Sequence, residues 1–298
     1  MYIKLANPRL AELAASLRQH PNFTEAAHFM MRGYLKSFNG TGPFNAITVS
    51  ESTQYLCWYI VYLDYWRVDE DPRSGVLANV VRDFAKERGL ASGPRVFTLL
   101  NLLRVAGLIQ AEAPIGNARL MRYRPTSRVV EMVKPILDSV ARAAQLLGFG
   151  AGFRRHVDAY PDATFAILGH VFKEYYLETG PLFEQVELMR PYVARNGALK
   201  VVTSVYVGED RQRAKTTGFS YLASRFGISR LQVARIIATG EENGHFIPWS
   251  KGAYGVEISA EARAAMDELT SVILAMLIDG QRIALDYEKA MRRAPTDL

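Results

Sequence analysis

The polar side chains with the clearest recognition chemistry follow Ser229 and are Arg230, Gln232, Arg235 and Thr239. An arginine can donate two parallel hydrogen bonds to O6 and N7 of guanine, and a glutamine can pair with N6 and N7 of adenine. A serine is well suited to cap the N-terminus of a helix, because its hydroxyl accepts a bond from a backbone N–H two or three residues on. If a helix starts at Ser229, these side chains lie on its solvent face.

Apolar residues mark the other face of this predicted helix and of a second helix earlier in the chain. They lie 4, 8 and 11 residues after a serine in both places: Val233, Ile237 and Gly240 after Ser229, and Val96, Leu100 and Leu103 after Ser92. This spacing follows the period of a buried helical face. We therefore expect related helices at both serines. The exposed face of the earlier helix carries Arg95, Thr98 and Asn101, with Leu102 alongside, and is the weaker surface for reading bases.

Residue types that support catalysis or metal binding are present but do not form a recognisable site. None of the five histidines has the helical spacing and carboxylate partner of a zinc motif, and His170 and His245 are interpreted as structural. The single cysteine, Cys57, lies in an apolar run, where we expect it to be buried. Residues 148–152 are interpreted as a glycine-rich linker, and the acidic residues of 64–71 as a solvated loop. We therefore expect no enzyme activity, no metal and no cofactor.

A β-hairpin is predicted directly after each of the two helices. After the second helix, residues 244–247 begin a strand, 248–255 form the tip and 256–258 return. After the first, residues 107–109 begin a strand, 114–117 form the tip and 119–123 return. Short strands bounded by glycine, proline and asparagine are typical of hairpins.

The chain repeats itself at a nearly constant interval. Thr-Gly-Pro-Phe at 41–44 returns as Thr-Gly-Pro-Leu at 179–182, and the serine at 92 returns at 229, shifts of 138 and 137 residues. Self-similarity at a fixed period marks duplicated structure. We expect one unit over 1–150 and another over 151–298, joined near 148–161. Further predicted helices precede and follow each Thr-Gly-Pro turn: 24–38 and 52–66 in the first unit, 162–178 (capped by Asp162) and 191–207 in the second.

The stretch Leu-Ala-Ser-Arg-Phe-Gly-Ile-Ser-Arg-Leu-Gln-Val-Ala-Arg-Ile-Ile at 222–237, followed by Glu-Asn-Gly-His-Phe-Ile at 242–247, resembles the helix-turn-helix of bacterial winged-helix regulators of the MarR and GntR types. The resemblance implies a mainly α fold with small β-hairpin wings, duplicated as a tandem winged helix-turn-helix with pseudo-two-fold symmetry. In such families the helix after the serine enters the major groove, and the wing lies over the backbone or the minor groove. The first unit departs from the second in having Gly93 and Pro94 where the second has Arg230 and Leu231.

Positive charge gathers near these elements. The formal net charge is +6 over 298 residues, and residues 211–240 contain no aspartate or glutamate. Each lysine or arginine that neutralises a phosphate releases a counterion and so adds sequence-independent affinity for DNA. The predicted contacts to double-stranded DNA are Ser92, Arg95, Thr98, Asn101, Arg119, Arg122, Arg124, Arg211, Arg213, Lys215, Thr216, Ser229, Arg230, Gln232, Arg235, Lys251 and Tyr254.

Aromatic residues are dense over 55–66 and at Tyr175 and Tyr176. Two interpretations stay open: a helix packed between the units, and a pocket between the units for a small-molecule effector. Apolar stripes over 129–140 and 266–277 are either ordinary core or surfaces that join the units or two copies of the chain, so a homodimer also stays open.

Together these features favour a cytoplasmic, sequence-specific transcription regulator that binds no membrane. The N-terminus carries charges, and the most apolar segment, 269–278, is about half a membrane span. Two alternatives use the same elements: a plasmid- or phage-type replication initiator with tandem winged helices, and a winged-helix protein-interaction scaffold. Repeated binding sites near an origin would favour the initiator, and the absence of salt-dependent DNA affinity would favour the scaffold.

Overall fold

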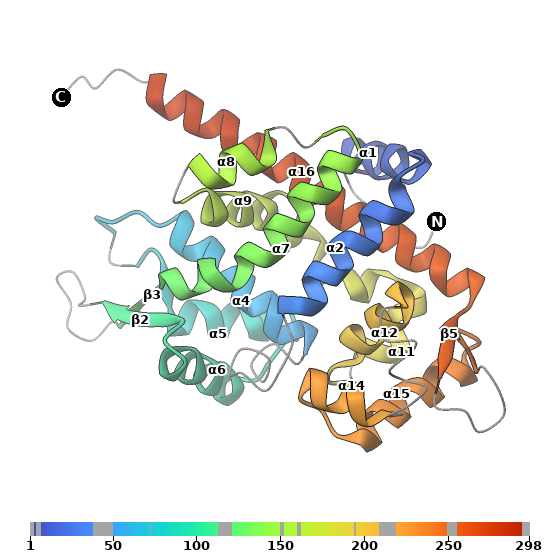
Figure 1. Cartoon of the computed structure of the whole chain (residues 1–298). Coiled ribbons are helices and arrows are strands. Elements are labelled where there is room, and N and C mark those ends of the chain that lie inside the picture. The colour runs from blue at the N-terminus through green and yellow to red at the C-terminus, as the bar shows by residue number, and fades with distance from the viewer. Residues whose placement is uncertain are drawn as a thin grey trace.

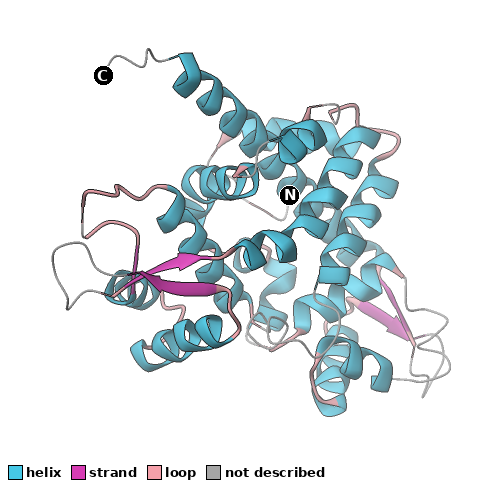
Figure 2. Cartoon of the chain, turned by 60° about the vertical axis from the view of Figure 1, so that its left-hand side comes forward, coloured by secondary structure: helices cyan, strands magenta, loops and turns pink. Residues whose placement is uncertain are grey.

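The structure is a computed structural model that describes residues 3, 7–37, 50–71, 73–112, 121–149, 152–159, 162–193, 195–208, 219–248 and 255–293. It is mainly helical and carries two small antiparallel sheets at its flanks (Figures 1 and 2), which confirms the predicted fold class at that level. No helix in the described ranges is both long and apolar enough to cross a bilayer.

The elements follow a similar order in the two halves. The first half contains α1 (Pro8–Gln19), α2 (Phe23–Ser37), α4 (Glu51–Tyr65), β1 (Val76–Leu77), α5 (Ala78–Glu87), α6 (Gly93–Val105), β2 (Ile109–Glu112), β3 (Arg122–Pro125) and α7 (Ser127–Leu146). The second half contains α8 (Phe153–Ala159), α9 (Ala163–Val171), the π-helix η1 (Phe172–Tyr176), α10 (Leu177–Thr179), the 3₁₀ helices η2 (Leu182–Gln185) and η3 (Glu187–Met189), α11 (Arg190–Val193), α12 (Ala198–Val207), α14 (Phe219–Phe226), α15 (Arg230–Glu242), β4 (Phe246–Pro248), β5 (Val256–Ile258) and α16 (Ala260–Arg293).

The long helices pack in reciprocal pairs. Within each half, a helix near the start packs on the last long helix: α2 on α7, and α9 on α16. Between the halves, α4 packs on α9 while its counterpart α12 packs on α2, and α1 packs on α16 while α8 packs on α7. An exchange of the two halves therefore reproduces the same contacts, as in a self-complementary two-fold interface. The halves form one helical body at the top of Figure 1.

The repeat seen in the sequence extends to individual backbone bonds. The turns before α6 and α15 contain Gly89 and Gly227, with φ of 65° and 64°. Past each glycine, the N–H of Leu90 donates to the carbonyl of Ala85 (2.8 Å), and that of Ile228 to Ala223 (3.1 Å). After each hairpin, Thr126 N–H donates to Leu108 and Ser259 N–H to His245, at 2.9 and 2.8 Å. The two halves thus share local geometry at the helix pair and at the hairpin.

Below the helical body lie two α/β modules. The first module contains α5, α6 and a three-stranded sheet of order β1-β3-β2, and the second contains α14, α15 and the β4–β5 hairpin. In Figure 1 both helix pairs lie at the same end of the molecule, and the two hairpins lie on opposite flanks. Residues 113–120 and 249–254, between the paired strands, lie outside the described residues.

The two modules are joined to the helical body differently. The first module has a hydrophobic core of its own, with Val81, Val96 and Leu100 at its centre and Leu56 of α4 as part of it. In the second module, Phe226 and Ile237 belong to one cluster that continues through α16, α9 and α2. The apolar stripe of α16 is largely buried within the chain and that of α7 is buried or half-buried, so much of each serves as core and as contact between the halves.

Two predicted helices differ from the structure. The helix expected over 191–207 is broken: α11 ends at Val193, and α12 begins only after Gly197, whose φ of 75° ends the helical path. The helix expected over 162–178 contains the π turn η1, and Asp162 stands at its start without a side-chain capping bond. Helices α2 and α4 lie within one residue of their predicted bounds. The Thr-Gly-Pro-Phe turn at 41–44 lies outside the described residues.

The aromatic cluster packs between the halves, as one of its two interpretations required. Tyr55 and Tyr59 of α4 contact Phe172 of η1 at ring-centroid distances of 5.0 and 5.6 Å. The hydroxyl of Tyr55 donates to the carbonyl of Tyr176 at 2.5 Å. Cys57 on the same helix lies against the core of the first module, and burial raises the pKa of its thiol to about 12.

Candidate nucleic-acid interface

Local sequence explains how α15 is placed in the second module. Helix α14 stops at Gly227, and Ser229 caps α15 by accepting a hydrogen bond from Gln232 N–H at 3.1 Å. On its inner face, Val233, Ile236 and Ile237 are buried. Near the end of the helix, a Cβ on Gly240 would lie 2.1 Å from the ring of Phe246, so only glycine lets α15 pack this closely on β4.

The outer face of α15 offers two free arginines. Arg230 and Arg235 are exposed, and no ion pair to a described residue involves either side chain. Both are therefore available to a base or a phosphate. Gln232 is half-buried, and its amide nitrogen lies 3.4 Å from the carbonyl of Asn196, so reading a base would require it to release that bond.

One residue predicted at this surface is buried instead. Thr239 is 6% exposed and its hydroxyl donates to the carbonyl of Arg235 at 2.8 Å, so it belongs to the inner face of the helix. Arg225 of α14, which lies in the stretch 211–240 without acidic residues, is also buried, with its guanidinium 5.3 Å from the ring centroid of Phe226. The positive surface of the second module is therefore smaller than its sequence indicates.

Helix α6 occupies the equivalent place in the first module but presents a different surface. Ser92 stands at its N-cap without a side-chain capping bond, and Pro94 lies in the first turn. Arg95, Thr98 and Asn101 are exposed, as predicted. Two of the three already have partners. The Thr98 hydroxyl donates to the Pro94 carbonyl at 3.0 Å, and Asn101 accepts from the Arg104 guanidinium at 3.1 Å.

Large apolar side chains lie among these polar groups of α6. Phe97 is 50% exposed, Leu102 48% and Val105 76%. Sequence reasoning placed only Leu102 on this face. The other two were recognisable, because positions 97 and 105 fall outside the buried set at 96, 100 and 103.

Arg122, predicted to contact DNA, is buried rather than exposed. Its side chain is 7% exposed, lies beneath Gly75 and pairs with Glu112 across the β2–β3 ladder at 3.4 Å. The same carboxylate also lies 3.6 Å from Arg67 and 3.6 Å from Arg124. An arginine of a β-hairpin points to one of two faces, and position 122 faces the core.

Arg124 is the arginine of the described part of the β2–β3 hairpin that stays accessible. Its side chain is 47% exposed, and its contact with Glu112 is long. Arg128, just past the hairpin, donates to the carbonyl of Ala106 at 3.0 Å, near the end of α6. The acidic residues at 64–71 include two partners of Arg67: Asp64 at 3.1 Å and Asp69 at 2.8 Å. Part of the acidic segment is therefore an ion-pair network rather than a solvated loop.

Seven predicted contact residues lie outside the described part of the chain: Arg119, Arg211, Arg213, Lys215, Thr216, Lys251 and Tyr254. The strands that frame the second wing are described, with Phe246 opposite Ile258 and Pro248 opposite Val256.

His170 and His245 pack against neighbouring aromatic side chains. His170 is buried against the rings of Tyr65, Trp66 and Tyr287, and burial lowers its pKa to about 4. The Nδ1 atom of His245 lies 3.0 Å from the hydroxyl of Tyr192, and burial lowers the pKa of this histidine as well. Within the described ranges, no three histidine, cysteine or acidic side chains gather in a way that could hold a metal ion.

Comparison of the chain with family models, curated proteins and solved structures found no match.

Proposed function

We propose that this chain binds double-stranded DNA sequence-specifically, with its two modules acting as winged helix-turn-helix units of a transcription regulator. The observation that carries the proposal is the outer face of α15. A capped helix, held by a short turn against a preceding helix and followed by a hairpin, presents Arg230 and Arg235 to solvent without an ion-pair partner among the described residues. Arginines in this setting can read guanine in the major groove.

The placement of the second helix adds support. Helix α6 is the counterpart of α15 and lies at the same end of the molecule (Figure 1). The reciprocal packing of the long helices relates the two modules much as a two-fold axis relates the subunits of a dimeric regulator. One chain with two such helices can contact two half-sites, and because their outer faces differ, the half-sites should differ in sequence.

Selection of bound sequences from a random duplex pool, followed by fluorescence-anisotropy titration, tests the proposal. Arg230→Ala and Arg235→Ala should each weaken binding to the selected site by about tenfold, since a bidentate contact to a base contributes about 1–3 kcal/mol. Arg95→Ala should cost less. Arg142→Ala is the matched control, because this exposed arginine lies on α7, away from both modules.

Affinity should also fall steeply as salt rises, because phosphate contacts release counterions. Loss of the same affinity in Arg95→Ala as in Arg235→Ala would contradict the asymmetric assignment. Absence of any enriched sequence, with binding that is indifferent to salt, would contradict DNA recognition as a whole.

A protein-interaction scaffold is the second candidate, and the apolar outer face of α6 favours it for the first module. Exposed Phe97, Leu102 and Val105 suit contact with another protein better than contact with phosphate. In that case Arg230→Ala and Arg235→Ala would leave the affinity for the protein partner unchanged, and Phe97→Ser would abolish partner binding.

A further inference from the structure

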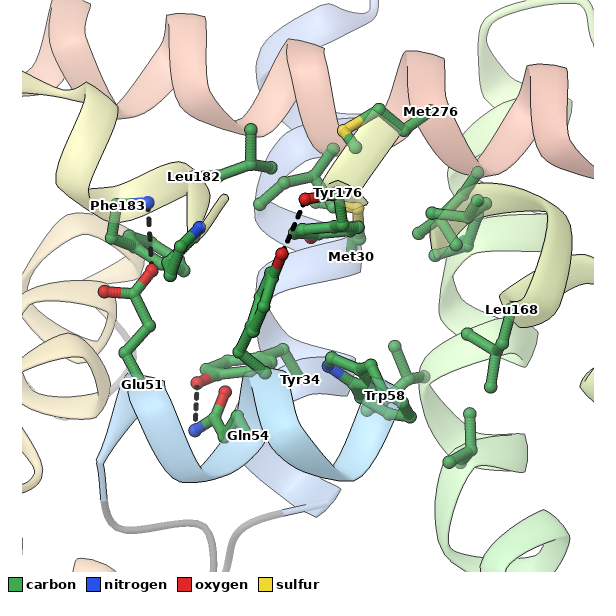
Figure 3. A pocket seen from close by; sticks show the side chains of 18 of the residues that line it. Met30, Tyr34, Glu51, Gln54, Trp58, Leu168, Tyr176, Leu182, Phe183 and Met276 are labelled. Carbon is green, nitrogen blue, oxygen red and sulfur yellow. Dashed lines mark hydrogen bonds between the residues drawn. The ribbon is translucent and has the colours of Figure 1, made fainter. Parts of the chain in front are cut away.

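A cavity of about 130 Å³ lies between the two halves of the chain (Figure 3). Its walls come from counterpart helices of both halves: α2 and α9, α4 and α12, and α7 and α16. The cavity therefore sits at the centre of the reciprocal packing rather than inside either module. An apolar cavity of similar size, on the order of 150 Å³, holds one benzene molecule.

Most of the wall is apolar. Figure 3 shows Met30, Leu168, Leu182 and Met276 reaching the cavity from four different elements, with Trp58 at its lower edge. A water molecule in such a space finds few hydrogen-bond partners, so the cavity favours an apolar guest. An aromatic or alicyclic ring fits the walls by size and by chemistry.

Two residues of this wall, Thr203 and Glu51, each have a buried side-chain oxygen without a partner among the described residues. The side chain of Thr203 on α12 is fully buried, and its Oγ1 forms no hydrogen bond with any described residue. A buried hydroxyl left unpaired costs free energy. A guest that carries one hydroxyl group can pair with Thr203 while its ring contacts the apolar wall.

The charges around the cavity exclude an ionic guest. No lysine, arginine or histidine belongs to the described lining, so a carboxylate guest would find no counter-ion. The one carboxyl group is that of Glu51, whose Oε1 accepts from Phe183 N–H at 3.0 Å (Figure 3). Burial raises the pKa of Glu51 to about 8, partly offset by that N–H, so at neutral pH the group is mostly protonated and does not attract a cation.

Glu51 also borders a smaller neighbouring cavity of about 20 Å³, which has room for one water molecule. Its second oxygen has no protein partner among the described residues, and a water there would satisfy it. The unpaired Thr203 hydroxyl has no such neighbour, because it lines only the larger of these two spaces.

We propose that the central cavity binds an uncharged, single-ring molecule with one hydroxyl group, and that this hydroxyl bonds to Thr203. The dense aromatic residues of the sequence left open a pocket for a small-molecule effector between the units. The proposal gives that effector a binding place and a chemical class. The binding site stands on its own and does not require that the modules bind DNA.

Isothermal titration of the full chain with phenol and with toluene tests the site, because the two probes differ by a hydroxyl in place of a methyl group. Both should bind the wild type. In Thr203→Val, which keeps the shape of the side chain, the ratio of phenol affinity to toluene affinity should fall about fivefold. In Thr239→Val, a buried threonine of the second module, the ratio should not change.

Leu168→Phe reduces the cavity and should weaken both probes together, which locates the binding. Benzoate and benzylamine should bind more weakly than phenol. Failure of phenol and toluene to bind the folded wild type would overturn the site, and an unchanged ratio in Thr203→Val would overturn the role of Thr203. Tighter binding of benzoate or benzylamine would overturn the uncharged class of ligand.

Discussion

The two modules share a backbone plan and differ in what they expose. Both have a helix pair joined through a left-handed glycine, and both close with equivalent bonds after the hairpin. Yet α15 exposes Arg230 and Arg235 with one large apolar side chain, Leu231, whereas α6 exposes Arg95 among three, Phe97, Leu102 and Val105. The inner faces, which fix the fold, have kept the same spacing. The outer faces, which touch other molecules, have not, and so the modules should serve different partners or different half-sites.

The two hairpins differ in the opposite sense. The strand register places Arg124 opposite Gln110 in the first module, and Glu257 opposite Ile247 at the matching place in the second. The described positive charge of the first module thus includes its hairpin, while that of the second is on its helix. Electrostatic attraction to a duplex would therefore engage different parts of the two modules.

The cores differ in how far they extend. The buried cluster of Leu100 of α6 comes from the first module and α4, with only Val129 and Met132 of α7 packed against it among the described residues, while the equivalent Ile237 of α15 belongs to a cluster that runs through the helical body. We infer that the first module can open alone and that the second cannot, because local opening requires few contacts with the remainder of the fold.

Truncation of these two residues has the largest expected effect and tests this difference directly. Leu100→Ala and Ile237→Ala each remove a buried aliphatic side chain and should cost about 3 kcal/mol. In Leu100→Ala, hydrogen exchange should rise in α5, α6, β2 and β3 only. In Ile237→Ala it should also rise in α16 and α9.

The control for this comparison is Leu231→Ala, because this α15 side chain is 60% exposed and contributes little to either core. It should leave exchange unchanged throughout. Identical exchange patterns in Leu100→Ala and Ile237→Ala would show that the two modules are coupled to the helical body to the same degree.

A second difference lies where each helix meets its hairpin. The first module has Leu103 and Ile109, both buried, where the second has Gly240 and Phe246. The second module thus pairs a small residue with a large one where the first module pairs two residues of intermediate size. We expect Gly240→Leu to destabilise the chain by about 2 kcal/mol, since the added side chain meets the Phe246 ring.

The double variant Gly240→Leu with Phe246→Ile copies the first module and should recover more than half of that loss, as measured by urea unfolding. Phe246→Ile alone should be destabilising, because it leaves a cavity beside the glycine. A double variant whose loss equals the sum of the single losses would mean that the two sites do not compensate for each other and that this alignment of the modules is incorrect.

The sequence predicted the elements that local rules determine. Ser229 and Gly227 mark the cap and the stop of the helices on either side, and the apolar spacing after Ser92 identifies the inner face of α6. The break before α12 was also visible in principle, because Asn196 and Gly197 form a turn signal within the predicted helix.

Other features depend on contacts between distant parts of the chain. The local sequence predicts a hairpin at position 122 but not the face on which its side chain lies. Arg122 is buried because Glu112 and Gly75, distant in sequence, lie against it. The π turn of η1 likewise places Phe172 against Tyr55 and Tyr59, over a hundred positions earlier in the chain. The central cavity is formed by helices from both halves, so no local pattern could locate it.

The smallest expected effect concerns acid stability. His245 starts the second hairpin where the first has Leu108, and burial lowers its pKa from the ordinary value of 6.5, with nearby Glu261 acting in the opposite direction. As the pH falls below 6.5, the unfolded chain takes up a proton at this residue before the folded chain does, so the free energy of unfolding decreases. Because the ring is only half-buried, the loss should be under about 1 kcal/mol.

Urea unfolding at pH 7 and pH 5 should show a smaller decline in the free energy of unfolding for His245→Leu than for the wild type. The decline that remains in the variant reflects other groups, including His170. An equal decline in both proteins would mean that His245 titrates alike in the folded and unfolded chains, and the two hairpins would then respond to acid in the same way.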